Sequence, residues 1–249
     1  MIVLRSQREI EKIRKACLIV TEILECLRER VGPGITTWDL NAVSEELADR
    51  KRVKPAFKGY HGYPYALCTS VNEEVVHGMP SRQRHLKEGD IISLDFGVVC
   101  EGYYGDAAVT VPVGRIDESA VRLCKVTEES LYEGIRRATL GNRLSDISHA
   151  IQEYVEARGF SVVREFVGHG IGQQLHESPQ IPNYGPPGKG VKLKEGMVFA
   201  IEPMINEGRP EVEILEDHWT AVTVDRRLSA HFEHTIVVTR NGPDILTRN

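Results

Sequence analysis

The sequence contains an internal repeat that limits the folds open to it. The stretch LKEGDIISLD begins at Leu86 and LKEGMVFAIE begins at Leu193, an offset of 107 residues. GITTWDL, beginning at Gly34, and GNRLSDI, beginning at Gly141, are separated by the same 107 residues. One offset that holds over two distant segments predicts two related halves with the same order of elements.

Each half begins with a predicted pair of amphipathic helices. Ser6-Gln7-Arg8-Glu9 has the form of a capping box, and apolar residues follow it at spacings of three and four as far as Leu27. A second helix is expected after Thr36. Apolar spacing over 121–135 and 147–155 predicts the equivalent pair in the second half.

Segments rich in β-branched residues follow each helix pair. Bounded by glycine, proline or charged residues, they are typical of strands. We expect strands over 91–96, 107–113, 198–201, 211–215, 219–224 and 235–239. Because helices and strands occur in separate blocks, the sequence predicts an α+β fold with a largely antiparallel sheet.

Composition argues against several classes of protein. A chain of 249 residues, 41% hydrophobic and 27% charged, can bury a substantial core. The net charge of −5 gives no reason to expect nucleic acid binding, and no apolar run approaches the roughly 20 residues that span a bilayer. Arg5 interrupts the apolar start, which is unlike a signal peptide. Five cysteines without a C-x-x-C pair fit a reducing cytoplasm.

Acidic residues recur at the repeated strands. Asp95 and Glu202 hold equivalent positions in the repeat, so a pseudo-twofold axis would bring both to a central seam. Asp106 follows a glycine-rich hairpin expected at 102–105, and Glu233 precedes the last apolar strand. Buried carboxylates need a cation or a hydrogen-bond donor, because an unpaired buried charge costs several kcal/mol.

A histidine completes the set of candidate ligands. His169 lies in FVGHGIGQQLHESP, where glycines allow close approach of the backbone. Four carboxylates and one imidazole exceed the three protein ligands of a usual catalytic zinc site, and they suit two adjacent divalent ions. The mostly oxygen ligand set favours Mn²⁺, Fe²⁺, Co²⁺ or Zn²⁺.

With these residues, the sequence resembles the methionine aminopeptidases, a family with the pita-bread fold. The resemblance runs from about Ser6 to Arg240. It implies one catalytic domain over 1–249, with halves at about 6–113 and 114–240 around a curved sheet and with the helices outside. The five metal ligands and two supporting histidines of the family match Asp95, Asp106, His169, Glu202, Glu233, His77 and His176.

Spacing separates the branches of this family. Type 2 members carry a large helical insertion between the last two glutamate ligands, whereas Glu202 and Glu233 are only 31 residues apart. X-Pro peptidases share the ligands but have a large additional N-terminal domain. The resemblance is therefore to type 1, in its short bacterial form.

The resemblance also implies a reaction. The enzyme would remove the N-terminal methionine from nascent proteins whose second residue is small, through a water or hydroxide that bridges the two ions. Glu202 would carry the proton of this water to the leaving amine. His176 would donate a hydrogen bond to the oxyanion, and His77 would contact the scissile amide.

A methionine pocket follows from the same resemblance. Phe57 stands where bacterial relatives often have cysteine, and Leu175 stands where they often have phenylalanine; both changes alter the volume of the pocket. Aromatic faces and a soft thiol suit a thioether. The matching residues are Tyr60, His61, Tyr63, Cys68 and Trp219.

Several alternatives stay open. An X-Pro-type peptidase of the same fold and a non-catalytic peptide-binding module are the other functions considered. His61, His231 and His234 are open between pocket, support of the ligands and structure. We expect a cytoplasmic monomer that binds the N-terminal methionine of nascent polypeptides and recognises neither nucleic acid nor membrane. The physiological metal and any transient ribosome contact are undetermined.

Overall fold

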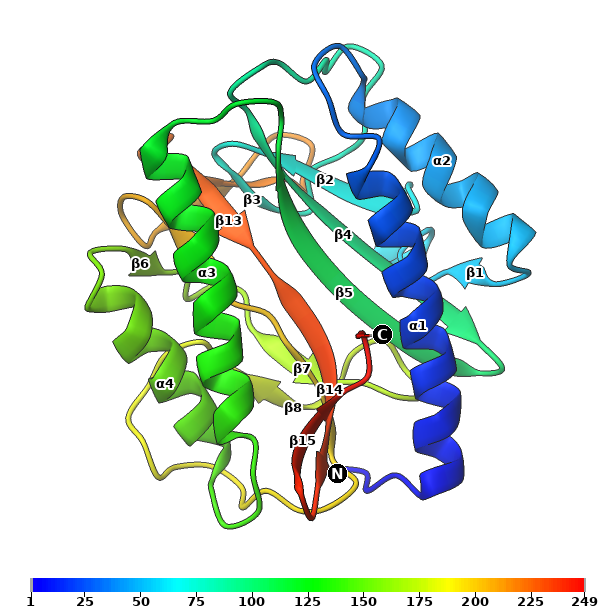
Figure 1. Ribbon diagram of the computed structural model, residues 1–249, viewed down its shortest axis with the longest axis vertical. Helices are drawn as coiled ribbons and strands as arrows, with labels where there is room; N and C mark the ends of the chain where they lie inside the picture. The colour runs from blue at the N-terminus through cyan, green and yellow to red at the C-terminus, as the bar shows by residue number, and fades with distance from the viewer. Residues whose placement is uncertain (1, 249) are drawn as a thin grey trace.

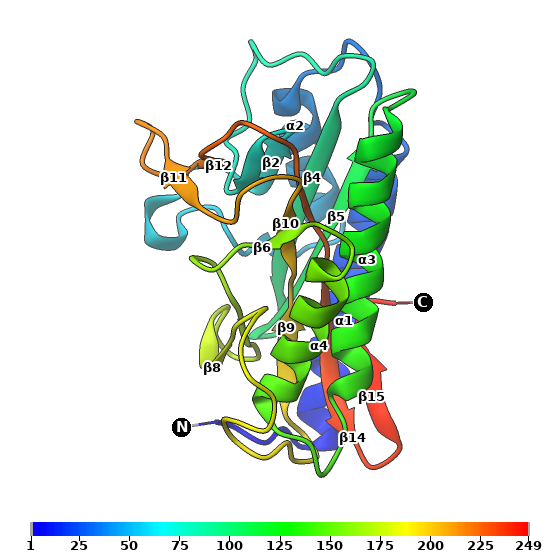
Figure 2. The same cartoon turned by 90° about the vertical axis from the view of Figure 1, so that its left-hand side faces the viewer.

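The computed structural model describes residues 2–248 of the chain. Within this range, four α-helices lie along one face of a curved sheet, and the loops and smaller sheets lie on the other (Figures 1 and 2). The predicted α+β class, with helices outside the sheet, is confirmed. The helices are α1 (Gln7–Arg28), α2 (Thr37–Arg50), α3 (Glu118–Arg137) and α4 (Leu144–Glu156).

The main sheet is antiparallel, as predicted. Its strands follow the order β1-β4-β5-β14-β9-β7-β8, while β2 pairs with β4 and β15 pairs with β14. The strands of this sheet are β1 (Lys54–Pro55), β2 (Leu67–Val71), β4 (Ile91–Cys100), β5 (Tyr103–Pro112), β7 (Gly168–Gly170), β8 (Glu177–Ile181), β9 (Val198–Ile201), β14 (Glu233–Thr239) and β15 (Gly242–Ile245).

Two three-stranded sheets and a short 3-10 helix, η1 (Tyr60–Gly62), complete the described structure. β12 lies between β11 and β3, and this small sheet extends away from the helical face in Figure 2. β10 lies between β13 and β6 in the other. The strands are β3 (Glu74–Val76), β6 (Ser161–Val162), β10 (Met204–Asn206), β11 (Val212–Ile214), β12 (Ala221–Thr223) and β13 (Ser229–His231).

Local sequence explains where the helices begin. Ser6 precedes α1, and its backbone N–H and hydroxyl both donate to the carboxylate of Glu9, at 2.9 and 2.7 Å. The predicted capping box is therefore present. Thr36 caps α2 in the same way, by accepting from the backbone N–H of Asp39 at 3.1 Å. The apolar stripe predicted for α1 is buried against the sheet.

Hydrogen bonds recur at the offset found in the sequence. An isolated bridge joins Thr36 to His85, and another joins Arg143 to Lys192, 107 residues further on. The N–H of Leu86 donates to the carbonyl of Ile35 at 2.9 Å, and the N–H of Leu193 donates to that of Asn142 at 2.9 Å. The repeated sequence thus corresponds to repeated local structure.

The strands around the first two acids are longer than predicted. β4 and β5 form one ten-residue hairpin whose turn is Glu101-Gly102. Asp95 therefore lies inside a strand rather than at its end, and Asp106 lies in β5 rather than after a turn. The glycines misled the sequence reading, because Gly105 is a packing position. A Cβ there would lie 2.5 Å from the backbone nitrogen of Cys17 in α1.

Other strand boundaries differ for local reasons. The strand expected over 219–224 is only Ala221–Thr223, because the Asp217 side chain accepts from the backbone N–H groups of Trp219 and Thr220 at 2.8 Å each and holds them in a turn. The strand expected over 211–215 is Val212–Ile214. Within residues 2–248, no helix combines the length and hydropathy needed to cross a membrane.

Gly105→Ala should destabilise the fold. The added methyl group must displace the α1 backbone, since Cys17 N and Ala16 C would lie 2.5 and 2.7 Å from it. Overpacking of this kind costs about 1–3 kcal/mol. Gly32→Ala is the matched control, because a Cβ at Gly32 meets nothing within 4 Å. Urea unfolding curves should show a loss only for Gly105→Ala, and equal stability of the two variants would contradict this packing.

Candidate metal centre and substrate cavity

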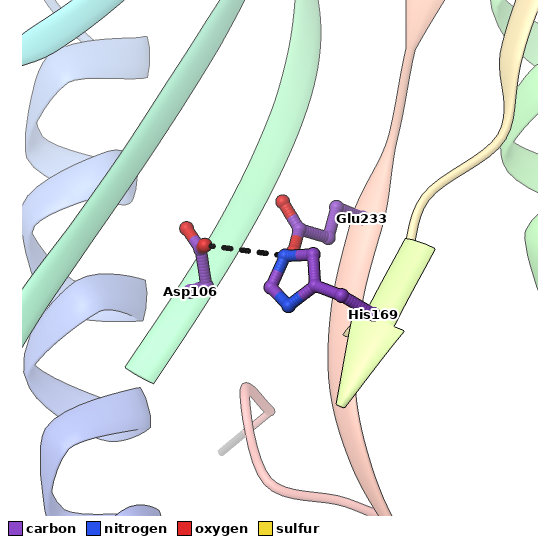
Figure 3. Close-up of side chains that lie close together, drawn as sticks. All are labelled: Asp106, His169 and Glu233. Carbon is purple, nitrogen blue, oxygen red and sulfur yellow. Dashed lines mark ion pairs between the residues drawn. The ribbon is translucent and has the colours of Figure 1, made fainter. Parts of the chain in front are cut away.

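The central strands bring the five predicted ligands together. Asp95 and Asp106 come from β4 and β5, and Glu233 begins β14, where it pairs with Ala108 of β5. His169 is in β7, and Glu202 directly follows β9. Figure 3 shows the side chains of Asp106, His169 and Glu233 pointing toward one another from three different strands.

Distances within this cluster suit shared coordination of cations. The Nε2 atom of His169 lies 3.4 Å from Oε1 of Glu202 and 4.0 Å from Oδ2 of Asp106. Asp106, His169 and Glu233 each offer one ligand atom, and these atoms all lie within 4.8 Å of one another. Nδ1 of His169 donates to the carbonyl of Gly170 at 2.9 Å, which leaves Nε2 free to face the acids.

Three of the acids carry an oxygen with no hydrogen-bond partner in the described chain: Asp95 Oδ1, Asp106 Oδ1 and Glu233 Oε1. All three atoms are buried. A buried carboxylate oxygen without a donor is costly, whereas a cation would satisfy it. The donor set of carboxylates and one imidazole therefore fits divalent metal ions.

Burial and mutual repulsion control the protonation of the cluster. Burial raises the pKa of Asp95 to about 7. Burial, followed by the charge of Asp95, raises the pKa of Asp106 and Glu202 well above the ordinary range. The pKa of Glu233 also rises well above its ordinary value, through burial and then the charge of Asp106. Without cations, the cluster therefore holds protons near neutral pH.

The neighbouring histidines are neutral. Burial lowers the pKa of His169 to about 3 and that of His77 to about 4, and in both cases His176 adds to the effect. The short His169–Glu202 distance is thus not an ion pair between charged groups. A neutral imidazole is the form that binds a metal ion.

One cavity of about 220 Å³ joins the acids to an apolar pocket. Every residue assigned to the site from sequence lines it. Its walls are Phe57, Tyr60, His61, Tyr63, Cys68, His77, Asp95, Asp106, His169, Leu175, His176, Glu202, Trp219 and Glu233.

The apolar end of the cavity has aromatic walls. The rings of Tyr63 and Trp219 meet edge to face with centroids 5.1 Å apart. Cys68 is the β2 neighbour of Asp95, and burial raises the pKa of its thiol well above the ordinary value, so the thiol is neutral. Phe57 and Leu175, the two departures from the family pattern, both lie in this wall.

The two supporting histidines lie between the pocket and the acids. The rings of His176 and His169 have centroids 4.3 Å apart. Nδ1 of His176 is 2.9 Å from the hydroxyl of Tyr60. His77 packs its ring on Phe166, with centroids 5.3 Å apart.

The three histidines left open by the sequence separate clearly. His61 lines the cavity. His231 is buried with its Nε2 3.9 Å from Oε2 of Glu202, and that nitrogen has no hydrogen-bond partner within residues 2–248. His234 contacts Tyr132 and Thr247 instead. Strand alternation was the available signal, because His234 is adjacent to Glu233 and must point to the opposite face.

Comparison with known proteins identifies the class. The model of metallopeptidase family M24 matches residues 11–240. The chain therefore belongs to metallopeptidase family M24, and its pita-bread fold is confirmed.

The similar proteins place it more narrowly, among the methionine aminopeptidases of type 1. The chain is 54% identical over 248 residues to methionine aminopeptidase 1 of Bacillus subtilis, covering 100% of both chains, and 52% identical to the enzyme of Clostridium acetobutylicum, covering 99% of both. A crystal structure of methionine aminopeptidase from Thermotoga maritima has a TM-score of 0.98 and 54% identity, with 100% of both chains covered. A prolidase from Pyrococcus furiosus, at 23% identity and a TM-score of 0.80, shares the fold.

The metal-free protein should lose stability as the pH rises from about 6.5 to about 8.5. The folded pKa values of the four acids lie above the unfolded values near 4, so the folded state binds more protons and its stability falls with rising pH. The histidines act in the opposite sense, but their effect is complete above about pH 6.5.

Thermal melting at the two pH values measures this effect. We expect a decrease of about 5 °C or more without metal and almost none with saturating Mn²⁺, which replaces the protons. Glu74→Gln is the control for another buried acid, whose pKa burial raises to about 7. A metal-free melting temperature that increases over this range would contradict the protonated cluster.

Proposed function

We propose that the chain removes N-terminal methionine with two divalent ions and accepts a small second residue. The observation that carries this proposal is the single cavity of about 220 Å³, in which five potential ligands adjoin a pocket with aromatic walls and a thiol. An exopeptidase that recognises methionine needs both parts within one residue's length. The activity itself agrees with the methionine aminopeptidases to which the chain belongs.

Asp95, Asp106, His169, Glu202 and Glu233 would hold the two ions. The unpartnered oxygens of Asp95, Asp106 and Glu233 support this assignment, since a carboxylate that bridges two ions uses both of its oxygens. When bound, such ions acidify water and polarise a carbonyl group. Co²⁺, Mn²⁺, Fe²⁺ and Zn²⁺ all suit this donor set.

Glu202 is the group we assign to proton transfer. It follows β9 rather than lying inside a strand, and its two oxygens lie near His169 at 3.4 Å and His231 at 3.9 Å. Its pKa is raised by burial and by the other acids, so it readily takes up a proton from the attacking water. Glu202 then delivers this proton to the amine as the peptide bond breaks.

His176 and His77 orient the substrate. If the Tyr60 hydroxyl donates to Nδ1 of His176, the proton of the neutral imidazole is on Nε2, where it can be donated to the developing oxyanion. His77 is also neutral, and it lines both this cavity and the adjoining one. That position fits contact with the scissile amide.

The methionine side chain would occupy the pocket formed by Tyr60, His61, Tyr63, Cys68 and Trp219. Its thioether is polarisable and packs well against ring edges. Phe57 and Leu175 set the depth of the pocket from the opposite wall.

The rest of the peptide would leave through an adjoining cavity of about 490 Å³. The two cavities share His77, Asp95, His169, His176 and Glu202, so the second residue of the substrate must pass between the supporting histidines and the acids. That passage favours a small side chain.

We propose the same organisation and setting that the sequence predicts. The chain is one catalytic domain with halves at about 6–113 and 114–240, and it works as a cytoplasmic monomer on nascent polypeptides. Contact with the ribosome is left open. The complete ligand set favours catalysis over a passive peptide-binding module, and an X-Pro preference is an outcome of the substrate panel below.

Replacing individual ligands should abolish turnover and reduce metal content together. Asp106→Asn and Glu233→Gln keep the side-chain volume but remove the negative charge that the ions need. We expect less than about 1% of wild-type kcat for each, with metal measured by atomic emission. Asp90→Asn, in the exposed turn before β4, is the control. Full activity with a normal metal content in either ligand variant would contradict the site.

A panel of peptides tests the substrate. Met-Ala-Ser should be cleaved rapidly and Met-Leu-Ser at least ~100-fold more slowly, because the larger residue collides at the passage between the cavities. N-acetyl-Met-Ala-Ser should be resistant, since it lacks the free amine. Rapid cleavage of the acetylated peptide would indicate an endopeptidase, and faster cleavage of X-Pro bonds than of Met-Ala would favour the proline-specific alternative.

A further inference from the structure

Arg5 is buried against the wall of the substrate cavity although it lies in the segment before α1. Its side chain is 3% exposed. One guanidinium nitrogen, Nη2, donates to both carboxylate oxygens of Glu177, at 2.6 and 2.5 Å. Its backbone N–H donates to the carbonyl of Gly196 at 2.8 Å, which fixes the segment on the second half of the chain.

Glu177 closes the loop that carries His176. This loop, 171–176, connects β7 with β8. Oε1 of Glu177 accepts from the backbone N–H of Gln173 at 2.8 Å and from that of Gln174 at 3.0 Å. The carboxylate that binds Arg5 is therefore the same one that sets the turn of the loop.

The loop is also shaped around the guanidinium group. Gly172 packs so closely on Arg5 that a Cβ there would lie 2.2 Å from Nη2 and 2.6 Å from Cζ. The carbonyl of Gly172 accepts from the N–H of Tyr104 in β5 at 2.8 Å. Arg5 thus fills the space beneath the loop, and the loop has no side chain of its own there.

His176 depends on this loop for its position. Its ring is held by the Tyr60 hydroxyl at one end, while its backbone immediately precedes Glu177. A hydrogen-bond donor to an oxyanion must be placed accurately, because a shift of about 1 Å costs a large part of its effect.

We propose that Arg5 is a positioning residue for His176, acting through the carboxylate of Glu177 and the turn of the 171–176 loop. This inference rests on the role proposed for His176 in the cleavage reaction. It assigns a catalytic consequence to a residue that contacts neither the substrate cavity nor the metal ligands.

The variants isolate this contact. Arg5→Met removes the paired charge and keeps an unbranched side chain in the space. Glu177 still receives two backbone hydrogen bonds in this variant, so its carboxylate is not left without partners. Arg5→Lys restores a charge but not the planar guanidinium. Arg14→Met is the matched control, because Arg14 in α1 pairs with Asp244 at 2.5 Å on the exposed side of the fold.

A double-mutant cycle with His176→Ala supplies the test, read out as methionine release from Met-Ala-Ser by the Mn²⁺-loaded enzyme. His176→Ala should lower kcat by at least ~10-fold, and Arg5→Met by about 5- to 10-fold, with KM and metal content nearly unchanged. In the His176→Ala background, adding Arg5→Met should cost less than about 2-fold. Arg5→Lys should recover part of kcat, and Arg14→Met should match wild type.

Each other outcome contradicts a specific statement. Equal losses from Arg5→Met in the two backgrounds would mean that Arg5 does not act through His176. Unfolding of both Arg5 variants would make the residue structural and would overturn the inference. Wild-type release of methionine with unchanged kcat in Arg5→Met would overturn the inference alone, whereas no release by the wild-type chain would contradict the proposed function.

Discussion

Four carboxylates buried in one place are the constraint on which the rest of this structure depends. Asp95, Asp106, Glu202 and Glu233 converge although their charges repel and burial disfavours ionisation. A fold tolerates such a cluster only if protons or cations neutralise it. The rigid antiparallel strands that hold the acids prevent them from separating when the protons leave. The same rigidity makes the cluster a good metal site, because ligands that cannot move apart bind cations without further ordering.

The surrounding groups convert this cluster into a site with direction. His169 is held by the carbonyl of Gly170 with its Nε2 toward the acids, and His176 stands next to it with a neighbour in Tyr60. The apolar pocket lies on one side of these histidines and the second cavity on the other. A peptide can therefore be recognised at its first side chain and cleaved directly after it. The Arg5–Glu177 contact extends this control to the segment before the first helix.

Much of the site could be predicted because the repeat and its acids are visible in the sequence. The offset of 107 residues placed Asp95 opposite Glu202, and motif context supplied the other ligands. Strand limits were less accessible: Gly97 and Gly105 resemble turn residues, but they are glycines because neighbouring atoms leave no room for a Cβ. His231 and the Arg5–Glu177 pair were not assigned, since contacts between residues 172 positions apart leave no local pattern in a single sequence.

Proton release on metal binding tests the central claim most directly. Titration calorimetry of the metal-free protein with Mn²⁺ at pH 7, repeated in buffers of different ionisation enthalpy, gives the number of protons displaced. If the buried carboxyl groups are protonated until cations replace the protons, binding should release about two or more protons per chain. Uptake of metal with no proton release at this pH would mean that the acids are already ionised in the empty site, and it would contradict the account.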